Sequence, residues 1–442
     1  MAPDTILARP NAALDAALAE ARDAYTAARP KSAAAHQRAC AVLPGGNTRS
    51  VLYYSPFPTT MARGEGCMLE DIDGHRYVDL CGEYTAGLFG HSEPRILAAL
   101  QAALARGLNL AAVGENEARL AEILCSRFPS LDMVRFTNSG TEANLLAVGL
   151  ARTHTGRPAI MAMHGGYHGG LMTFAGGGTP TNVPFPVTLA PYNDIAVTLD
   201  LIEAHAADLA AIIVEPMIGN GGCMPAKPAF LRMLREETSR RGILLIFDEV
   251  MTSRHGSGGL QARLGITPDL TTLGKYIGGG MSFGAFGGRR EVMARLDATK
   301  PGSLSHSGTF NNNVLSMAAG CVAMEDIFTA EVAEAHVARG EALRARLDAV
   351  CQRVGGVMRF TGFGSMMQPH FRDGPIDRPY RLTPREDALR ELLFLDLLAG
   401  GVYAARRGLV ALSLAVGAAE MDQYVDAIEE FCASRGSLLR ET

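Results

Sequence analysis

Two residues have the types and spacing for covalent cofactor chemistry. Asp248 follows the apolar run 242–247, and Lys275 comes 27 residues later. That run is typical of a buried strand in an α/β sheet, so Asp248 is expected at the crevice where the carboxyl ends of strands bind ligands. Glycines flank Lys275, as Gly274 and Gly278–Gly280, and would let backbone approach a flat ligand. An aspartate for a pyridine nitrogen and a lysine able to form a Schiff base are what pyridoxal phosphate (PLP) chemistry requires, so we predict this cofactor.

A strand ending in acidic residues also occurs in P-loop nucleotide hydrolases, where the acid holds magnesium. Those enzymes also carry the pattern G-x-x-x-x-G-K-[ST]. The only Gly-Lys dipeptide here is Gly274-Lys275. Asp269 stands in place of the first glycine of the pattern, and Tyr276 in place of Ser/Thr. The sequence therefore excludes a P-loop site.

A third segment has the composition of a phosphate site. Ser139, Gly140 and Thr141 lie between a predicted strand at 133–136 and a predicted helix at 143–151. The start of a helix offers free backbone N–H groups and the positive end of the helix dipole, which suit a phosphate monoester. An ordinary helix N-cap explains the same residues. The phosphate role is therefore one of two interpretations at this point.

The next predicted strand, 159–163, ends in a segment rich in histidine and glycine. His164 and His168 could suggest a metal site, but an H-x-x-x-H motif needs a helix, and the glycines between them argue against one. We expect Tyr167 to stack on a planar ring instead. Glu215 closes a neighbouring predicted strand and is expected to line the same crevice.

The composition is that of an ordinary soluble globular protein, with 48% hydrophobic and 20% charged residues. A net charge of −5 gives no electrostatic footprint for nucleic acid or for an anionic membrane. The eight cysteines are scattered without a C-x-x-C pair, which favours reduced thiols over disulfides or a zinc site. No apolar run approaches the ~18 residues of a membrane span, and we find no signal-peptide pattern. We predict a cytoplasmic protein without a metal.

The order of the predicted elements indicates an α/β fold with two lobes. Between about residues 65 and 325, short apolar strands alternate with helices, which predicts a mostly parallel sheet covered on both faces. A long amphipathic helix at 331–354 and a strand at 358–367 then indicate a smaller α+β lobe. The predicted domains are a large PLP-binding domain at 65–325 and a small domain made of 1–64 and 326–442.

Together these segments resemble the class III aminotransferases, PLP enzymes of fold type I, from about Arg49 to the C-terminus. The resemblance implies a homodimer whose active sites lie at the subunit boundary. It also implies the following roles: Lys275 forms the Schiff base with PLP, Asp248 pairs with the pyridine nitrogen, Tyr167 stacks on the ring, Ser139, Gly140 and Thr141 hold the phosphate, and Thr309, in the polar loop 307–313, reaches the phosphate of the neighbouring subunit.

Different motifs match different subfamilies. The runs 215–220, 269–280 and 284–288 are similar to glutamate-1-semialdehyde aminomutase. The mutase pattern has Gly-Thr-Leu-Ser-Gly-Asn-Pro where this chain has Gly308–Asn313 with a different sequence, and Gly-Phe-Arg where it has Ser253-Arg254-His255. The following runs are instead similar to bacterial β-phenylalanine (aromatic β-amino acid) aminotransferases: 48–58, 83–87, 306–313 and Arg407-Gly408.

The second resemblance implies transfer of an amino group from a β-amino acid to a 2-oxo acid. The carboxylate of a β-amino acid lies one carbon further from the reacting centre than that of an α-amino acid, so it needs its own arginine clamp. Arg49 is expected to bind this carboxylate, with Tyr84 in the pocket wall. Arg407 is expected to swing in for the carboxylate of 2-oxoglutarate and out for an apolar side chain; Arg406 beside it is the alternative.

Other functions stay open at this point. The aminomutase, or a transaminase for other ω-amino acids or amines, uses the same cofactor residues. A catalytically silent protein with the PLP fold is a different class of answer, against which Lys275 and Asp248 argue because both are intact.

Overall fold

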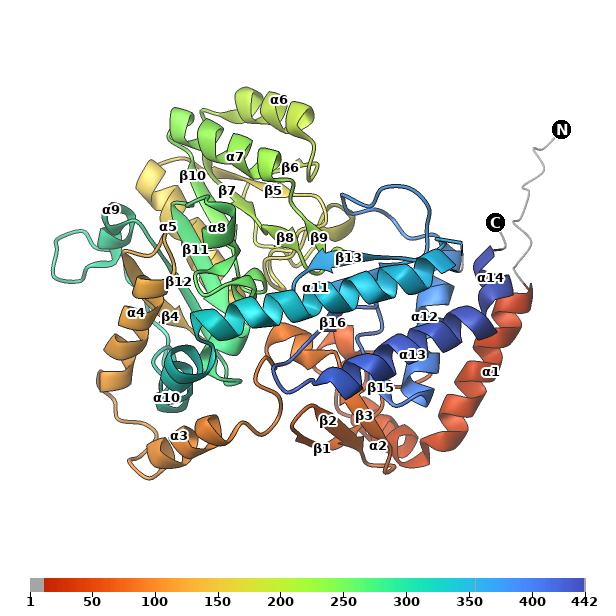
Figure 1. Cartoon of the computed structure of the whole chain (residues 1–442). Helices are drawn as coiled ribbons and strands as arrows, with labels where there is room; N and C mark the ends of the chain where they lie inside the picture. The colour runs from red at the N-terminus through yellow and green to blue at the C-terminus, as the bar shows by residue number, and fades with distance from the viewer. Residues whose placement is uncertain (1–11, 354, 441–442) are drawn as a thin grey trace.

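A computed structural model describes residues 12–353 and 355–440. Its largest feature is a seven-stranded sheet in the order β4-β12-β11-β10-β7-β5-β6 (Figure 1). These strands are β4 Met133–Thr137, β12 Gly284–Gly288, β11 Leu270–Gly274, β10 Leu244–Asp248, β7 Leu209–Val214, β5 Ala159–Met163 and β6 Val187–Ala190. Neighbouring strands are parallel except for β12, which is antiparallel to both β11 and β4. The predicted mostly parallel α/β sheet is confirmed.

Helices cover both faces of this sheet, as continuous apolar strands require. Helix α5 (Gly140–Thr155) packs on one face, and α6 (Ile195–His205) and α7 (Pro228–Arg241) pack on the other (Figure 1). Ile246 of β10 lies in the core beneath α5, whereas Phe247 lies in the core beneath α7. Because side chains alternate along a strand, Asp248 returns to the α5 face.

Strand β12 is not predicted by the sequence, because three of its five residues are glycine and glycine is depleted in strands. A Cβ at Gly284 would lie 2.2 Å from the carbonyl oxygen of Ser139, so the close backbone approach requires glycine there. Gly284 pairs with Thr137 of β4 on one side and Gly274 of β11 on the other. The strand thereby brings the ends of β4 and β11 to the same edge of the sheet.

The remaining strands form three small sheets. They are β1 Met61–Glu65, β2 Met68–Asp71, β3 Arg76–Asp79 and β15 Val402–Tyr403 in the first; β13 Arg359–Phe363, β14 Met366–His370 and β16 Val410–Ala411 in the second; β8 Met217–Ile218 and β9 Met224–Pro225 in the third. The prediction of one strand at 358–367 is wrong, because the chain reverses at Gly364 and forms the antiparallel hairpin β13–β14. Glycine there adopts a φ of 55°, which the turn needs.

The other helices surround the small sheets and the free end of the large one. They are α1 Ala12–Ala28, α2 Pro30–Cys40, α3 Pro94–Leu104, α4 Glu115–Arg127, α8 Gly259–Leu264, α9 Arg290–Met293, α10 Val314–Val322, α11 Ala330–Arg353, α12 Pro384–Ala399, α13 Ala418–Ser434 and α14 Gly436–Arg440. The predicted long helix at 331–354 is α11; residue 354 lies outside the described residues. Helix α1 packs against α12, far away in the sequence (Figure 1).

The predicted domain boundary near residue 325 is crossed by one sheet. Strand β3 pairs in parallel with β15, which lies more than 300 residues later in the chain. The division into 65–325 and a small domain stays a prediction. Within residues 12–353 and 355–440, none of the helices is both long and apolar enough to cross a bilayer.

Candidate active site

The carboxylate of Asp248 is the centre of a buried hydrogen-bond network at the carboxyl end of β10. Asn144 of α5 donates from Nδ2 to Asp248 Oδ2 at 2.8 Å, and His168 Nδ1 lies 2.8 Å from the same oxygen. The backbone N–H of Val250 donates to Oδ1 at 3.0 Å. An ionised carboxylate only accepts, so His168 Nδ1 carries a hydrogen. Three donors thus fix the carboxylate in orientation.

Asn144 and His168 are themselves held in place. Thr272 of β11 donates to Asn144 Oδ1 at 2.6 Å, and Asn144 Nδ2 also donates to the carbonyl oxygen of His168 at 3.2 Å. The Nε2 atom of His168 is buried and has no hydrogen-bond partner among residues 12–353 and 355–440. From the sequence alone, His168 has no predicted role beyond the rejected metal site. Its contact with Asp248 arises because the segment after β5 and the end of β10 meet at one sheet edge.

Lys275 directly follows β11, the neighbour of β10, and begins the short turn Lys275–Gly278. Its φ of 55° is in the left-handed region, which a residue with a side chain occupies at a cost and which is common at functional sites. Burial is the main cause that lowers the pKa of Lys275 to about 8; Arg407 adds to this effect and Asp248 opposes it. No hydrogen bond of Lys275 Nζ is found within the described chain. The amine is therefore available for chemistry.

The predicted phosphate segment begins α5. Ser139 is its N-cap and accepts from the backbone N–H of Glu142 at 3.2 Å, while the Glu142 carboxylate accepts from the backbone N–H of Asn138 at 2.9 Å. This reciprocal cap leaves the first N–H groups of the helix, those of Gly140 and Thr141, pointing out of the helix end. The helix end therefore lies at the same edge as Asp248 with donors to offer an anion.

The segment after β5 contributes Tyr167, whose ring is 41% exposed. Its backbone N–H donates to Glu215 Oε1 at 2.9 Å, and the N–H of Gly219 donates to Glu215 Oε2 at 3.0 Å. Burial and the nearby Asp248 raise the pKa of Glu215, and His168 opposes the shift. Glu215 thus lies at the same sheet edge as Asp248 and His168, where it anchors the backbone of Tyr167.

The predicted substrate residues meet at the ring of Tyr84. The guanidinium of Arg49 lies 5.2 Å from the ring centre and that of Arg407 lies 5.1 Å from it. The Tyr84 hydroxyl donates to the carbonyl oxygen of Val51 at 3.1 Å, which fixes the ring. Arg49 also forms an ion pair with Glu83, which the sequence did not single out. Three segments far apart in the chain therefore converge on one aromatic ring.

Arg406 and Arg407 point to different surroundings, although they are adjacent in the chain. Arg406 donates to the carboxylates of Asp387 and Glu391 on α12, at 3.0 and 2.9 Å from Nη2. Arg407 has no carboxylate partner among the described residues, and its Nε is buried without a partner. The geometry therefore favours Arg407 over Arg406 as a clamp for an added carboxylate.

Thr309 does not join the other site residues in this single chain. It lies exposed in the loop between α9 and α10, and its side chain forms no hydrogen bond within the described residues. Asn138 donates from Nδ2 to Asn311 Oδ1 at 3.0 Å, which ties this loop to the start of α5. The next residue, Phe310, is 57% exposed.

Comparisons with known proteins agree with this arrangement. Residues 52–431 match the family described as aminotransferase class-III. A β-phenylalanine transaminase of Variovorax paradoxus is 51% identical, with 97% of this chain and 99% of that protein covered. The crystal structure of a β-phenylalanine aminotransferase from Variovorax paradoxus superposes with a TM-score of 0.95 at 50% identity, covering 96% of this chain and 99% of the other. A glutamate-1-semialdehyde 2,1-aminomutase of Nitratidesulfovibrio vulgaris is 38% identical over 85% of this chain and 92% of its own.

The chain is a class-III aminotransferase. It is therefore a PLP-dependent transaminase, and the predicted family, cofactor and reaction class are confirmed. The geometry of the aminotransferase fits the cofactor. A fixed carboxylate at Asp248, the amine of Lys275, which has no hydrogen-bond partner in the described chain, and a helix N-terminus share one sheet edge. A Cβ at Gly169 would lie 2.3 Å from Thr141 Oγ1, so glycine keeps that cradle open.

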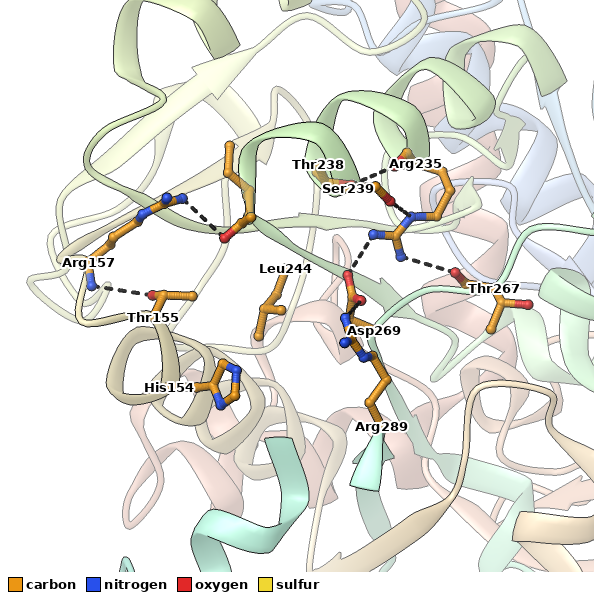
Figure 2. Close-up of a pocket in the computed structure, with 12 residues that line it drawn as sticks. His154, Thr155, Arg157, Arg235, Thr238, Ser239, Leu244, Thr267, Asp269 and Arg289 are labelled. Carbon is orange, nitrogen blue, oxygen red and sulfur yellow. Dashed lines mark hydrogen bonds and ion pairs between the residues drawn. The ribbon is translucent and has the colours of Figure 1, made fainter. Parts of the chain in front are cut away.

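A cavity of about 440 Å³ lies away from these residues, at the amino end of β10 and β11 (Figure 2). Its three arginines, Arg157, Arg235 and Arg289, all have partners in the fold. Arg235 and Arg289 each donate to Asp269 at 2.8 Å. Arg157 donates to the carbonyl oxygens of Arg241 and Gly242, where α7 ends and the helix dipole favours a cation. This cavity contains none of the predicted site residues, and its charges stabilise the fold.

Sequence reasoning missed the partners of the aminotransferase's site residues. Asn144 carried a signal, because it lies on α5 one turn after Thr141 and so faces the same edge as the start of the helix. Glu83 carried none, because an acidic residue beside an aromatic one is common on surfaces. In the part of the chain that the structure describes, no group of three or more His, Cys, Asp or Glu is arranged to hold a metal.

Proposed function

We propose that this aminotransferase moves an amino group from an aromatic β-amino acid, such as β-phenylalanine, to a 2-oxo acid. The observation that carries this proposal is the pair of guanidiniums about 5 Å from the Tyr84 ring centre, only one of which has a carboxylate partner. Two separate carboxylate clamps suit a donor and an acceptor that place their carboxylates at different distances from the reacting carbon. Similarity to the Variovorax enzyme supports the choice of donor.

The cofactor residues take the roles that the family resemblance implies. Lys275 holds PLP covalently, Asp248 holds the proton on its ring nitrogen, and Tyr167 stacks on the ring. Ser139, Gly140 and Thr141 hold the phosphate at the positive end of α5. Support comes from the shared sheet edge and from the donors that fix Asp248; Asn144 and His168 orient the carboxylate that would pair with the ring nitrogen.

When bound, PLP supplies an electron sink for the charge left on the substrate carbon after the proton departs. Lys275 Nζ takes that proton from the amino-bearing carbon, because its lowered pKa leaves a useful fraction of neutral amine near neutral pH. Asp248 keeps the opposite end of the site negative, which holds the ring nitrogen protonated. Tyr84 and the nearby arginines orient the substrate so that the carbon faces Lys275.

Arg49 binds the carboxylate of the β-amino acid, and Arg407 binds the second carboxylate of an acceptor such as 2-oxoglutarate. Arg407 swings away when the substrate presents an apolar group. Its loop supports this assignment, because Gly408 adopts a φ of 94° beside it and neither guanidinium end is tied to a carboxylate. Arg406 stays on α12 with its two carboxylates.

The active unit is a homodimer in the cytoplasm, with Thr309 serving the cofactor phosphate of the partner. A groove of about 490 Å³ between α3, α4 and α10 supports this proposal. Exposed apolar side chains lie around it: Leu104, Leu108, Leu110, Val113 and Phe310. Stable dimers bury such surfaces. Sedimentation at assay concentration should give a dimer, and a fully active monomer would refute the assignment of Thr309.

A half-reaction screen tests the substrate. The PLP form is mixed with one amino compound at a time, and loss of the PLP absorbance band is followed without an acceptor. β-Phenylalanine should react faster than β-alanine, α-alanine or glutamate-1-semialdehyde. A faster reaction with glutamate-1-semialdehyde would favour the aminomutase, and a faster reaction with β-alanine would favour a general ω-amino acid transaminase.

A further inference from the structure

The two arginines near Tyr84 differ in one respect that bears on substrate choice. Arg49 is already ion-paired with Glu83, and PLP chemistry gives Glu83 no role. Arg407 faces the same ring with no carboxylate partner in the described chain. A substrate carboxylate must therefore compete with Glu83 to bind Arg49. At Arg407 no carboxylate of the described chain competes with it.

An unusual backbone conformation at Glu83 accompanies its ion pair with Arg49. Glu83, Tyr84 and Thr85 have φ values of 45°, 54° and 83°, three successive left-handed residues with side chains. Such a run is costly and persists only where its surroundings enforce it. Asp79 does so in part, because its Oδ1 accepts from the backbone N–H groups of Cys81 and Gly82 at 2.9 and 3.0 Å.

The pair also lies within electrostatic reach of the catalytic amine. Glu83 raises the pKa of Lys275, whereas Arg49 and Arg407 lower it. The side chains of Arg49 and Glu83 are 44% and 59% exposed, so water screens their ion pair. Exposed pairs of this kind contribute little free energy, which means that an incoming carboxylate can displace Glu83.

We propose that Glu83 is a specificity-determining residue that occupies the Arg49 clamp as a resident counter-ion. It lowers the affinity of Arg49 for every carboxylate, so that only a ligand whose remaining atoms also contact the pocket still binds there well. Glu83 leaves the Arg407 clamp untouched. This inference rests on the proposed function for the assignment of Arg49 to the donor carboxylate.

The test uses 3-phenylpropanoate, which is β-phenylalanine without its amino group, and calorimetry on the holoenzyme. Because the probe cannot react, its dissociation constant reports the clamp and not turnover. Glu83→Gln should lower that constant about two- to fivefold, the effect of removing an exposed competing ion pair. Glu429→Gln is the matched control, because Glu429 forms a comparably exposed ion pair with Arg353; it should leave the constant unchanged.

A double-mutant cycle assigns the effect to one arginine. Glu83→Gln should have no effect on probe binding in an Arg49→Ala background and should keep its effect in an Arg407→Ala background. Unchanged or weaker binding in Glu83→Gln alone would overturn the counter-ion role, since Glu83 would then only position Arg49. If the wild type binds the probe but does not consume β-phenylalanine, the proposed donor fails while the role of Glu83 is still measured. If the wild type does not bind the probe, both fail.

Discussion

The proposed cofactor end and the proposed substrate end of the site are built in opposite ways. At the cofactor end, Asp248 is buried at the end of a central strand, and three donors fix its carboxylate. At the substrate end, Arg49, Tyr84 and Arg407 come from connecting segments, with strained backbone, an exposed ion pair and an unpaired guanidinium nitrogen. The first arrangement is held by buried hydrogen bonds, whereas the second contains charged groups that water or a ligand can reach.

This difference follows from what each end must do. The ring and the phosphate of the cofactor are unchanged through both half-reactions, so rigid groups that need no reorganisation serve them best. The substrate end must accept two different molecules in turn, so its charges need alternative partners. Loops on a rigid scaffold provide such adjustable groups.

Lys275→Ala should have the largest effect, because it removes both the covalent attachment and the base. We expect transamination to fall at least about a thousand-fold, while PLP can still bind without a covalent link. The measurement is amino transfer to 2-oxoglutarate. Lys300→Ala is the control, since Lys300 lies on the surface with its Nζ 3.9 Å from Asp297 Oδ2. Borohydride reduction followed by peptide mapping should label Lys275, and a label on another lysine would end the assignment.

Asp248→Asn keeps the shape of the side chain but removes its charge. The rate should fall by about two orders of magnitude, the cost of losing a preorganised electrostatic partner. PLP binding, measured by absorbance after dialysis, should persist because Lys275 is intact. Near-normal turnover with PLP bound would show that the rigid end does not depend on this carboxylate.

Arg49→Ala tests the donor clamp at the adjustable end. The apparent KM for β-phenylalanine should rise about tenfold or more, because hydrogen bonds from a charged donor are lost, while kcat changes less. Steady-state kinetics at saturating acceptor measure both constants. An unchanged KM would remove the β-amino acid assignment along with the clamp.

Arg407→Ala should raise the apparent KM for 2-oxoglutarate several-fold more than the KM for pyruvate, because only 2-oxoglutarate carries the second carboxylate. Arg406→Ala is the matched control beside it. Since Arg406 pairs with Asp387 and Glu391, its loss should lower the melting temperature and leave the KM values of both acceptors unchanged. An equal rise in the KM values of the two acceptors in Arg407→Ala would contradict the proposal that Arg407 swings in for the second carboxylate.

The smallest expected effect is a pH shift that links the two ends. Only the neutral amine of Lys275 attacks PLP, so covalent capture of PLP by the apoprotein should increase as pH rises through about 8. An ordinary lysine would need pH near ~10.4. Arg407→Gln removes a cation that lowers this pKa, so the midpoint should move to higher pH, by less than about one unit. A midpoint that stays in place or moves to lower pH would show that the ends are electrostatically independent.

The sequence predicted the rigid end well because strands bury both faces. Runs such as 244–247 must be apolar throughout, so the first polar residue after them marks the sheet edge. Asp248 and Glu215 were found in this way, and the glycines around Lys275 marked the adjoining turn. The sequence did not predict strand β12. Glycine is required at position 284 because neighbouring backbone comes close to it, and such an approach leaves no apolar pattern in the sequence.

The adjustable end depended on the tertiary structure. Nothing in the dipeptide Arg406-Arg407 tells the two apart; their difference arises because α12 presents Asp387 and Glu391 to only one of them. In the same way, the ion pair of Glu83 cannot be predicted locally, because only the fold brings Arg49 beside it. Local sequence determined the elements and the ends of strands, because burial imposes a periodic pattern on the residues themselves. Pairing between charges from distant segments was decided by the fold, because no local pattern records which of them will meet.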